Sequence, residues 1–162
     1  MGTDAVDPAI LKRSSLSRID YVDHFALTPF DATNASAERW ARTMFGDVPT
    51  AAERFIWKGL LRLRLRRGRS STTVAGWLIS EKSQSWIRLQ AASAALTANL
   101  ILHATEDSLS LTTLLTYERA RGSMVWRPLS SVHRRLSPGI LRDAVSELSV
   151  DDADAQDQSG RS

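Results

Sequence analysis

Cysteine is absent from the sequence, so the protein can form no disulfide bond, offer no thiol nucleophile and bind no metal through thiolates. Long hydrophobic runs are absent as well, and no segment approaches the roughly 20 apolar residues that a membrane-spanning helix needs. Residues 1–20 lack the apolar segment of a secretory signal peptide. These absences together predict a cytoplasmic protein.

Histidine is scarce, and the spacing of the three histidines excludes the H-x-x-x-H and H-E-x-x-H patterns of metal-binding helices. The sequence also contains no glycine-rich phosphate loop and no G-x-S-x-G nucleophile motif. We therefore assign no catalytic residue, and we expect neither a metal nor a cofactor. The same absences favour a binding protein over an enzyme.

Charge is distributed unevenly along the chain, which has a net charge of +3 at neutral pH. The residues after Val150 include four aspartates and no large apolar side chain, so we expect residues 150–162 to form a disordered acidic tail. Residues 1–18 show no clear periodicity and are predicted to be a flexible segment. The remaining residues, 19–149, have the length and apolar content of a single globular domain.

The first elements of this domain are predicted to be a strand and a helix. Residues 21–27 alternate between apolar and polar side chains, as in a half-buried strand. Helical periodicity follows at 34–46, where Asn34 or Ser36 can cap the amino end of the helix and Gly46 can end it.

A second helix is predicted from Thr50 to Gly68, and it opens with the T-x-x-E spacing of a capping box at Thr50 and Glu53. Residues 58–69 hold six cations and no acidic residue, which suggests an interaction domain with a basic patch for an anionic partner. The lack of an aromatic platform and of known motifs argues against nucleic acid, and a solvated face is the simpler interpretation. A peripheral membrane contact would use Arg62, Arg64, Arg66 and Arg67.

From residue 74 the periodicity changes from that of a helix to that of strands. Four strands joined by short polar links are predicted, which is the pattern of an antiparallel meander. Helical periodicity returns at 124–148 and completes the order β-α-α-β-β-β-β-α. We therefore predict an α+β fold in which a curved antiparallel sheet of about five to seven strands wraps on a long, kinked C-terminal helix. The four predicted strands are residues 74–82, 85–92, 96–105 and 109–120.

The C-terminal helix is predicted to bury one apolar stripe against the sheet. Pro128 fits the first helical turn, whereas Pro138 requires either a kink or a new helix capped by Ser137. The stripe continues in phase across Pro138, which favours one kinked helix. Arg134 and Arg135 face away from the stripe, either as a solvated face or as an anion site. The stripe consists of Val125, Leu129, Val132, Leu136, Ile140, Ala144 and Leu148.

Four segments carry a resemblance to known proteins: residues 40–49, 60–68 and 116–119, and the pattern W-R-P-x4-H-R-x3-P-x2-L at 126–141. On these segments the chain resembles the START-like, or polyketide-cyclase-like (SRPBCC), helix-grip superfamily, and most closely an uncharacterised bacterial family of domains of unknown function. The resemblance spans residues 20–148 and implies a hydrophobic cavity between the sheet and the C-terminal helix. It implies no catalytic residue. The last pattern is matched by Trp126, Arg127, Pro128, His133, Arg134, Pro138 and Leu141.

The function that this resemblance implies is the binding of an apolar or lipid-like small molecule in the cavity. Buried aromatic residues more often fill a core than contact a ligand, so each candidate also has a structural interpretation. The alternative from a different class is a cyclase- or hydrolase-type enzyme that uses cavity polar groups such as Tyr117 or His103. The sequence leaves the oligomeric state open. The candidate ligand-binding residues are Tyr117, His103, Trp77, Trp126, His133 and Arg134.

Overall fold

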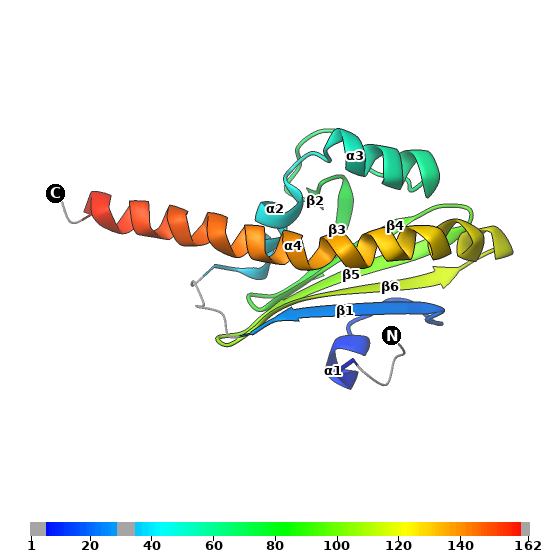
Figure 1. The fold of residues 1–162 in the computed structure, drawn as a ribbon, viewed down its shortest axis with the longest axis horizontal. Helices are drawn as coiled ribbons and strands as arrows, with labels where there is room; N and C mark the ends of the chain where they lie inside the picture. Colours follow the sequence, from blue (N-terminus) through cyan, green and yellow to red (C-terminus); the bar gives the residue numbers. More distant parts are fainter. Residues whose placement is uncertain (1–5, 29–34, 160–162) are drawn as a thin grey trace.

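The computed structural model describes residues 6–28 and 35–159. Within them, one antiparallel sheet of six strands runs through the molecule (Figure 1). The first strand, β1 (Tyr21–Leu27), pairs with the last, β6 (Leu109–Tyr117), so segments far apart in the sequence become neighbours in the sheet. From β6 the sheet continues through β5 (Leu96–Ala104), β4 (Trp86–Ala92), β3 (Trp77–Lys82) and β2 (Thr73–Val74).

The predicted α+β class and the antiparallel order of the strands are confirmed, and the sheet has one strand more than the sequence pattern outlines. The extra strand arises because a tight turn at Ala75 and Gly76 divides the segment predicted as one strand at 74–82. Both turn residues have positive φ angles, 49° and 83°, as two-residue hairpin turns require. The turn pairs Thr73 with Leu78.

Three helical segments lie on one side of the sheet (Figure 1). They are α4 (Ala120–Ser159), α2 (Ala37–Phe45), and α3 (Ala51–Arg54), which continues as the π-helix η2 (Phe55–Leu60). The pleat sends alternate apolar side chains of each strand towards these helices; Ile87, Leu89 and Ala91 of β4 are all buried. The main hydrophobic core therefore lies between this inner face of the sheet and the helices.

The outer face of the sheet is covered in part by the N-terminal segment, which contains α1 (Pro8–Leu11). Val6 and Ile10 are buried in a second, smaller core against this face. Asp7 caps α1, because its carboxylate accepts the Ala9 N–H at 2.7 Å. Residues 6–18, which the sequence predicts to be flexible, thus have a defined position against the sheet, and residues 1–5 lie outside the described part.

The helix predicted at 34–46 is confirmed as α2. The Ser36 hydroxyl accepts the Arg39 N–H at 3.2 Å and caps its amino end. Gly46 ends the helix with a φ of 69°, a conformation that favours glycine. Asn34, the other predicted cap, lies outside the described residues.

The helix predicted from residue 50 to residue 68 is shorter in the structure. Its capping box forms as predicted: the Thr50 N–H donates to Glu53 Oε2 at 2.7 Å, and the Glu53 N–H donates to Thr50 Oγ1 at 3.3 Å. The helical backbone nevertheless ends at Leu60. Beyond it Leu61 and Leu63 are buried, and the arginines between and after them are exposed. Buried and exposed side chains therefore alternate, as in an extended segment, and the period of a helix is lost.

The last helix, α4, continues through both internal prolines as one element. The alternative in which Ser137 caps a new helix is therefore wrong; the Ser137 hydroxyl donates instead to the main-chain oxygen of His133 at 2.9 Å. Helical backbone continues to Ser159, whereas the sequence predicts a disordered tail over 150–162. The sequence has no glycine or proline between Gly139 and Gly160 that would stop the helix earlier.

The buried face of α4 is rotated relative to the predicted apolar stripe. Val132 is 45% exposed, whereas Ser137 is only 1% exposed. His133 lies on the same face of α4 as the buried residues, because these positions follow one another at intervals of three or four residues. The side chain of Leu136 lies outside the described part. The buried residues of this face are Trp126, Ser130, Ser137, Leu141, Ala144 and Leu148.

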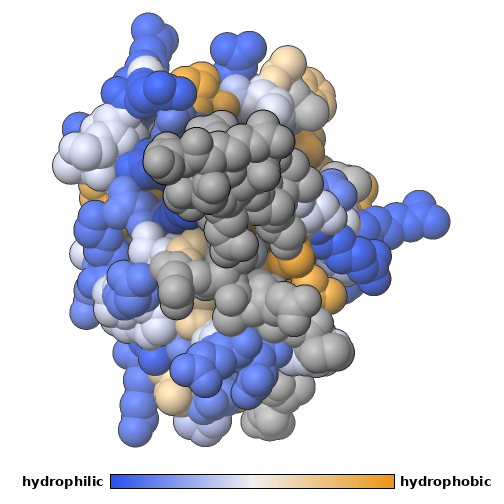
Figure 2. Space-filling model, turned by 90° about the vertical axis from the view of Figure 1, so that its left-hand side faces the viewer, coloured by the Kyte–Doolittle hydropathy of each residue, from blue (hydrophilic) through white to orange (hydrophobic). Residues whose placement is uncertain are grey.

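On the face drawn in Figure 2, hydrophilic residues predominate and the hydrophobic ones form small separate areas. Within the described ranges, no helix is both long and apolar enough to cross a bilayer. The large apolar side chains that are exposed are Val48, Phe55, Leu60, Leu78, Met124 and Val132.

Candidate ligand cavity

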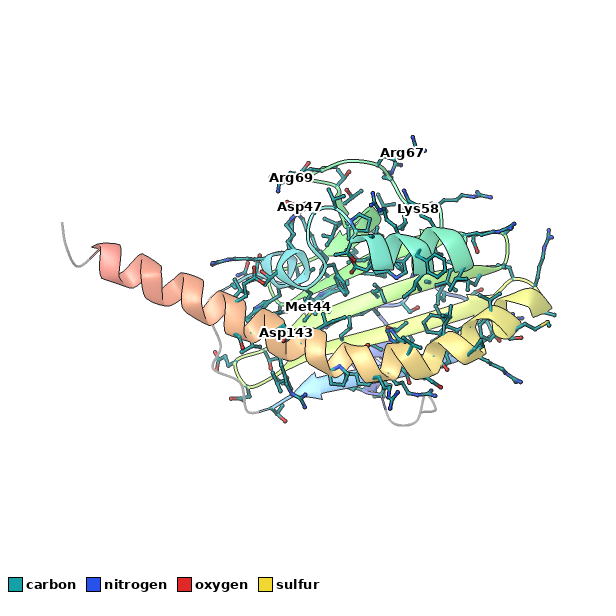
Figure 3. The ribbon with its side chains drawn as sticks, turned by 45° about the horizontal axis from the view of Figure 1, so that its top comes forward. Met44, Asp47, Lys58, Arg67, Arg69 and Asp143 are labelled. Atoms are coloured by element: carbon teal, nitrogen blue, oxygen red, sulfur yellow. The ribbon has the colours of Figure 1, made fainter. Side chains whose placement is uncertain are left out.

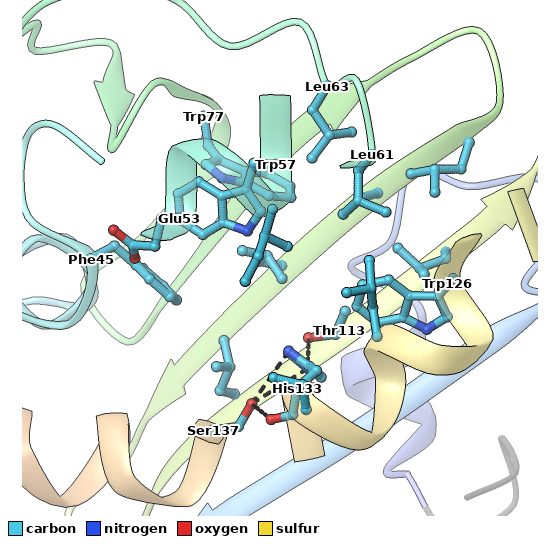
Figure 4. A pocket seen from close by; sticks show the side chains of 18 of the residues that line it. Phe45, Glu53, Trp57, Leu61, Leu63, Trp77, Thr113, Trp126, His133 and Ser137 are labelled. Atoms are coloured by element: carbon cyan, nitrogen blue, oxygen red, sulfur yellow. Dashed lines mark hydrogen bonds between the residues drawn. The ribbon is translucent and has the colours of Figure 1, made fainter. Parts of the chain in front are cut away.

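A cavity of about 120 Å³ lies between the inner face of the sheet, the π-helix η2 and α4 (Figure 4). Most of the side chains around it are apolar. The lining comes from the three strands β3, β5 and β6, from α3, η2 and α4, from the end of α2, and from the segment that follows η2. Four polar side chains also line it: Glu53, Thr113, His133 and Ser137. A predominantly apolar cavity with a few convergent polar groups is the usual form of a small-molecule site.

One wall of the cavity is aromatic. Trp57 of η2 packs edge-on against Trp77 of β3, with ring centroids 5.5 Å apart, and against Phe45, at 6.4 Å. Such edge-to-face pairs fix ring orientations as well as burying area. The π-helical geometry of η2 places Ile56 and Trp57 against the cavity while the neighbouring Phe55 is 64% exposed.

The polar end of the cavity is a hydrogen-bonded cluster on α4 and β6. The Nε2 atom of His133 lies 3.1 Å from the Thr113 hydroxyl oxygen. The Ser137 hydroxyl lies 3.4–3.5 Å from both ring nitrogens of His133, one turn further along α4. The same hydroxyl donates its proton to the His133 carbonyl, which ties the pair together (Figure 4). The imidazole ring is further held by Trp126, whose centroid is 5.4 Å away.

A buried acid stands next to this cluster on β1. Asp23 is directly opposite Thr113 in the β1–β6 register and is only 1% exposed. Cross-strand partners have Cβ atoms about 5 Å apart, so the carboxylate and the Thr113 hydroxyl share one small volume. The Tyr21 hydroxyl donates a hydrogen bond to Asp23 Oδ2. The ring of Tyr21 also packs edge-on against Trp126, with centroids 5.3 Å apart.

The electrostatics of the cluster follow from its burial. Burial lowers the pKa of His133; the negative charge of Asp23 opposes this effect and the positive charge of Arg134 adds to it. Burial also raises the pKa of Tyr21, and its hydrogen bond to Asp23 raises it further. At neutral pH the imidazole of His133 and the phenol of Tyr21 are therefore both neutral.

Glu53, at another side of the cavity, has a structural partner. Its carboxylate accepts hydrogen bonds from both the N–H and the hydroxyl of Thr50, each at 2.7 Å. The group therefore belongs to the capping box that starts α3.

Three of the six predicted ligand-binding residues line the cavity: Trp77, Trp126 and His133. Tyr117, at the end of β6, packs against the main core but is not among the cavity's lining residues. Arg134 is exposed on α4 and reaches the cluster only through its charge.

The prediction that His103 is a cavity group is wrong. In β5 the side chains of Leu100 and Leu102 point to the inner face, so the pleat turns His103 to the outer face. Its pKa is lowered by burial and by the charge of Arg13, a residue of the N-terminal segment.

Four residues in or beside the polar cluster were not predicted: Thr113, Ser137, Asp23 and Tyr21. One signal was present in the sequence, because Ser137 follows His133 by four residues and so shares its helix face. The position of Asp23 within an apolar strand is a second signal of a polar site, because a carboxylate among buried neighbours requires a hydrogen-bond or ion-pair partner. The pairing of β1 with β6 could not be read from the sequence.

No protein-family model matches the chain, and no significantly similar protein was found among curated proteins or among solved structures. Among the side chains that the structure describes, no group of three or more histidine, aspartate or glutamate residues is arranged to hold a metal ion. The fold and the cavity thus define an α+β domain with one apolar, ligand-sized chamber and a buried polar cluster at one end.

Proposed function

We propose that the protein is a small-molecule binding domain that holds an apolar ligand between its sheet and α4, in a helix-grip-like arrangement. The observation that carries this proposal is the cavity itself, with three tryptophans and one hydrogen-bonding cluster in its wall. The volume limits the occupant. An engineered apolar cavity of about 150 Å³ binds benzene, so a chamber of about 120 Å³ suits a single ring or a short chain. A longer lipid-like chain would require η2 to move away from α4.

The test is a titration with toluene, followed by the indole N–H signals of the five tryptophans in an NMR spectrum. Trp57, Trp77 and Trp126 line the cavity, and their signals should shift and saturate. Trp86 serves as an internal control, because it lies on the outer face beneath Arg13, whose guanidinium carbon is 4.9 Å from its ring. No shift at any cavity tryptophan, with no ligand retained in native mass spectra of the purified protein, would refute the proposal.

A second candidate function is contact with an anionic membrane surface. Arg62, Arg64, Arg66 and Arg67 are all exposed, and within the described residues none of them has an ion-pair partner. Arg69, by contrast, pairs with Asp47 at 2.7 Å. Figure 3 shows Lys58, Arg67 and Arg69 on the same side as α3. The neighbouring η2 exposes Phe55 and Leu60, so cations and apolar side chains adjoin as in membrane-surface helices.

This second candidate is tested by sedimentation with phosphatidylcholine vesicles that contain or lack phosphatidylserine. Each cation near an anionic surface contributes about 1 kcal/mol, so Arg66→Gln with Arg67→Gln should weaken binding by about tenfold or more. The matched control is Arg135→Gln with Arg142→Gln, which removes two exposed arginines from α4. Equal loss in both double variants, or no preference for phosphatidylserine, would refute a specific surface.

A further inference from the structure

We infer that the cavity selects a neutral ligand bearing a hydroxyl, carbonyl or amide group, and that it excludes carboxylates of the same size. This inference rests on the proposed binding function and specifies the chemistry of its ligand. It stands on the position of the cluster formed by Thr113, His133 and Ser137, on the buried carboxylate of Asp23, and on the absence of any cation from the described cavity wall.

The cluster has hydrogen-bonding capacity that its internal contacts leave unused. A neutral imidazole has one donor and one acceptor nitrogen, and Nε2 of His133 is engaged by Thr113. Ser137 donates its only proton to a main-chain oxygen, and its contacts with the ring nitrogens are long, at 3.4–3.5 Å. A ligand oxygen at this end can therefore accept from or donate to the imidazole or a hydroxyl. A purely apolar ligand would leave these groups without such a partner.

The charges around the cavity oppose a bound anion. Asp23 lies beside the cluster, and Glu53 lines the cavity from α3. The wall contains no lysine or arginine among its described residues. Arg134, the cation whose charge reaches His133, is exposed on α4, so water screens it. Like charges about 6 Å apart at an effective dielectric constant of about 20 repel enough to lower affinity by about 100-fold.

Protonation of His133 would supply a compensating cation, but burial lowers its pKa. The imidazole is therefore neutral at pH 7, and a carboxylate would meet Asp23 without a counter-charge. Neutral oxygen-containing ligands avoid this repulsion and keep the hydrogen bond.

The experiment compares ligands matched in size on the unmodified protein at pH 7. Toluene and phenol differ by a methyl and a hydroxyl group, and benzamide and benzoate differ in charge. We expect phenol to bind about tenfold more tightly than toluene, which corresponds to one net hydrogen bond, and benzamide about 100-fold more tightly than benzoate. Equal affinities within either pair would overturn the inference while toluene binding still supported the proposed function. Failure of all four ligands to bind would overturn both.

Two variants assign the effect to the named residues. Asp23→Asn should raise benzoate affinity towards that of benzamide and leave toluene affinity unchanged, so toluene reports whether the cavity is intact. Thr113→Val should remove the preference for phenol over toluene. If Asp23→Asn binds toluene normally and still excludes benzoate, Asp23 is not the source of the selectivity and the inference fails. If that variant does not fold, the benzamide–benzoate comparison on the unmodified protein decides the outcome by itself.

Discussion

The Nε2 atom of His133 lies 3.1 Å from the hydroxyl oxygen of Thr113, so one hydrogen bond joins the middle of α4 to the strand β6. Thr113 is 2% exposed, and its cross-strand partner is the buried Asp23. This contact places the imidazole at the cavity wall and fixes the position of the helix over the sheet.

Loss of this hydrogen bond should destabilise the protein. Thr113→Val keeps the shape of the side chain but leaves a buried imidazole nitrogen without its partner, which costs about 1–3 kcal/mol. Urea unfolding measures the change. Thr112→Val is the matched control, because Thr112 makes the equivalent contact with His24, at 2.8 Å, on the outer face. The control should lose similar stability and keep full affinity for cavity ligands; a loss of affinity in both variants would show that the effect is not local.

Filling the cavity should cost far less than overpacking the core beside it. Ala98 and Ala91 are cross-strand partners on the inner face, and Ala98 lines the cavity whereas Ala91 is not among its lining residues. Ala98→Leu should change the free energy of unfolding by less than about 1 kcal/mol and abolish toluene binding, whereas Ala91→Leu should cost about 1–3 kcal/mol. Thermal unfolding with and without toluene measures both effects. Equal costs at the two positions would mean that the chamber is not empty space.

Stability should fall as the pH is lowered through the range in which unfolded histidine titrates. Burial lowers the pKa values of His24, His103 and His133 in the folded protein. The unfolded chain then binds protons first, at a pH near 6.5, so the stability present above that pH is lost as the pH falls.

Urea unfolding at pH 7.5 and pH 5.5 tests this dependence. His133→Gln removes one titrating group and should flatten the pH dependence. Hydrogen bonds from Lys82 and then Arg42 lower the pKa of Glu38. Glu38 therefore affects stability only at a lower pH, and its contribution can be separated from that of the histidines. An identical slope in His133→Gln would contradict the burial of that imidazole.

Glu53 should prove structural although it lines the cavity. Its carboxylate accepts from the N–H and the hydroxyl of Thr50. Glu53→Gln preserves a capping box, so stability should change by less than about 0.5 kcal/mol, whereas Glu53→Ala should cost about 0.5–2 kcal/mol. Chemical denaturation compares the two. A large loss in Glu53→Gln would mean that the charge itself is needed.

Local patterns in the sequence determined most of the elements. The strand at 21–27, the capped helix ending at Gly46, the capping box at Thr50 and the helical continuity across Pro138 all depend on residues within about two turns of one another. Backbone geometry and local hydrogen bonding set these interactions, and both depend on residues that are close in the sequence. The cap of α1 is equally local, because Asp7 directly precedes Pro8, yet this short helix packs against the outer face of the sheet.

The site depended on contacts between distant segments, and only the tertiary structure decided them. The sequence places His133 beside an apolar stripe, but the buried face of α4 is rotated from that stripe. His133 and Ser137 therefore face the sheet, where His133 contacts Thr113. Asp23 and Thr113 are 90 residues apart in the chain and directly opposite in the sheet, through the pairing of the first strand with the last. Burial energy is roughly proportional to area and does not specify which apolar faces meet. Strand register and helix rotation make that choice, and they place one acid, one imidazole and two hydroxyl groups at the end of an apolar cavity.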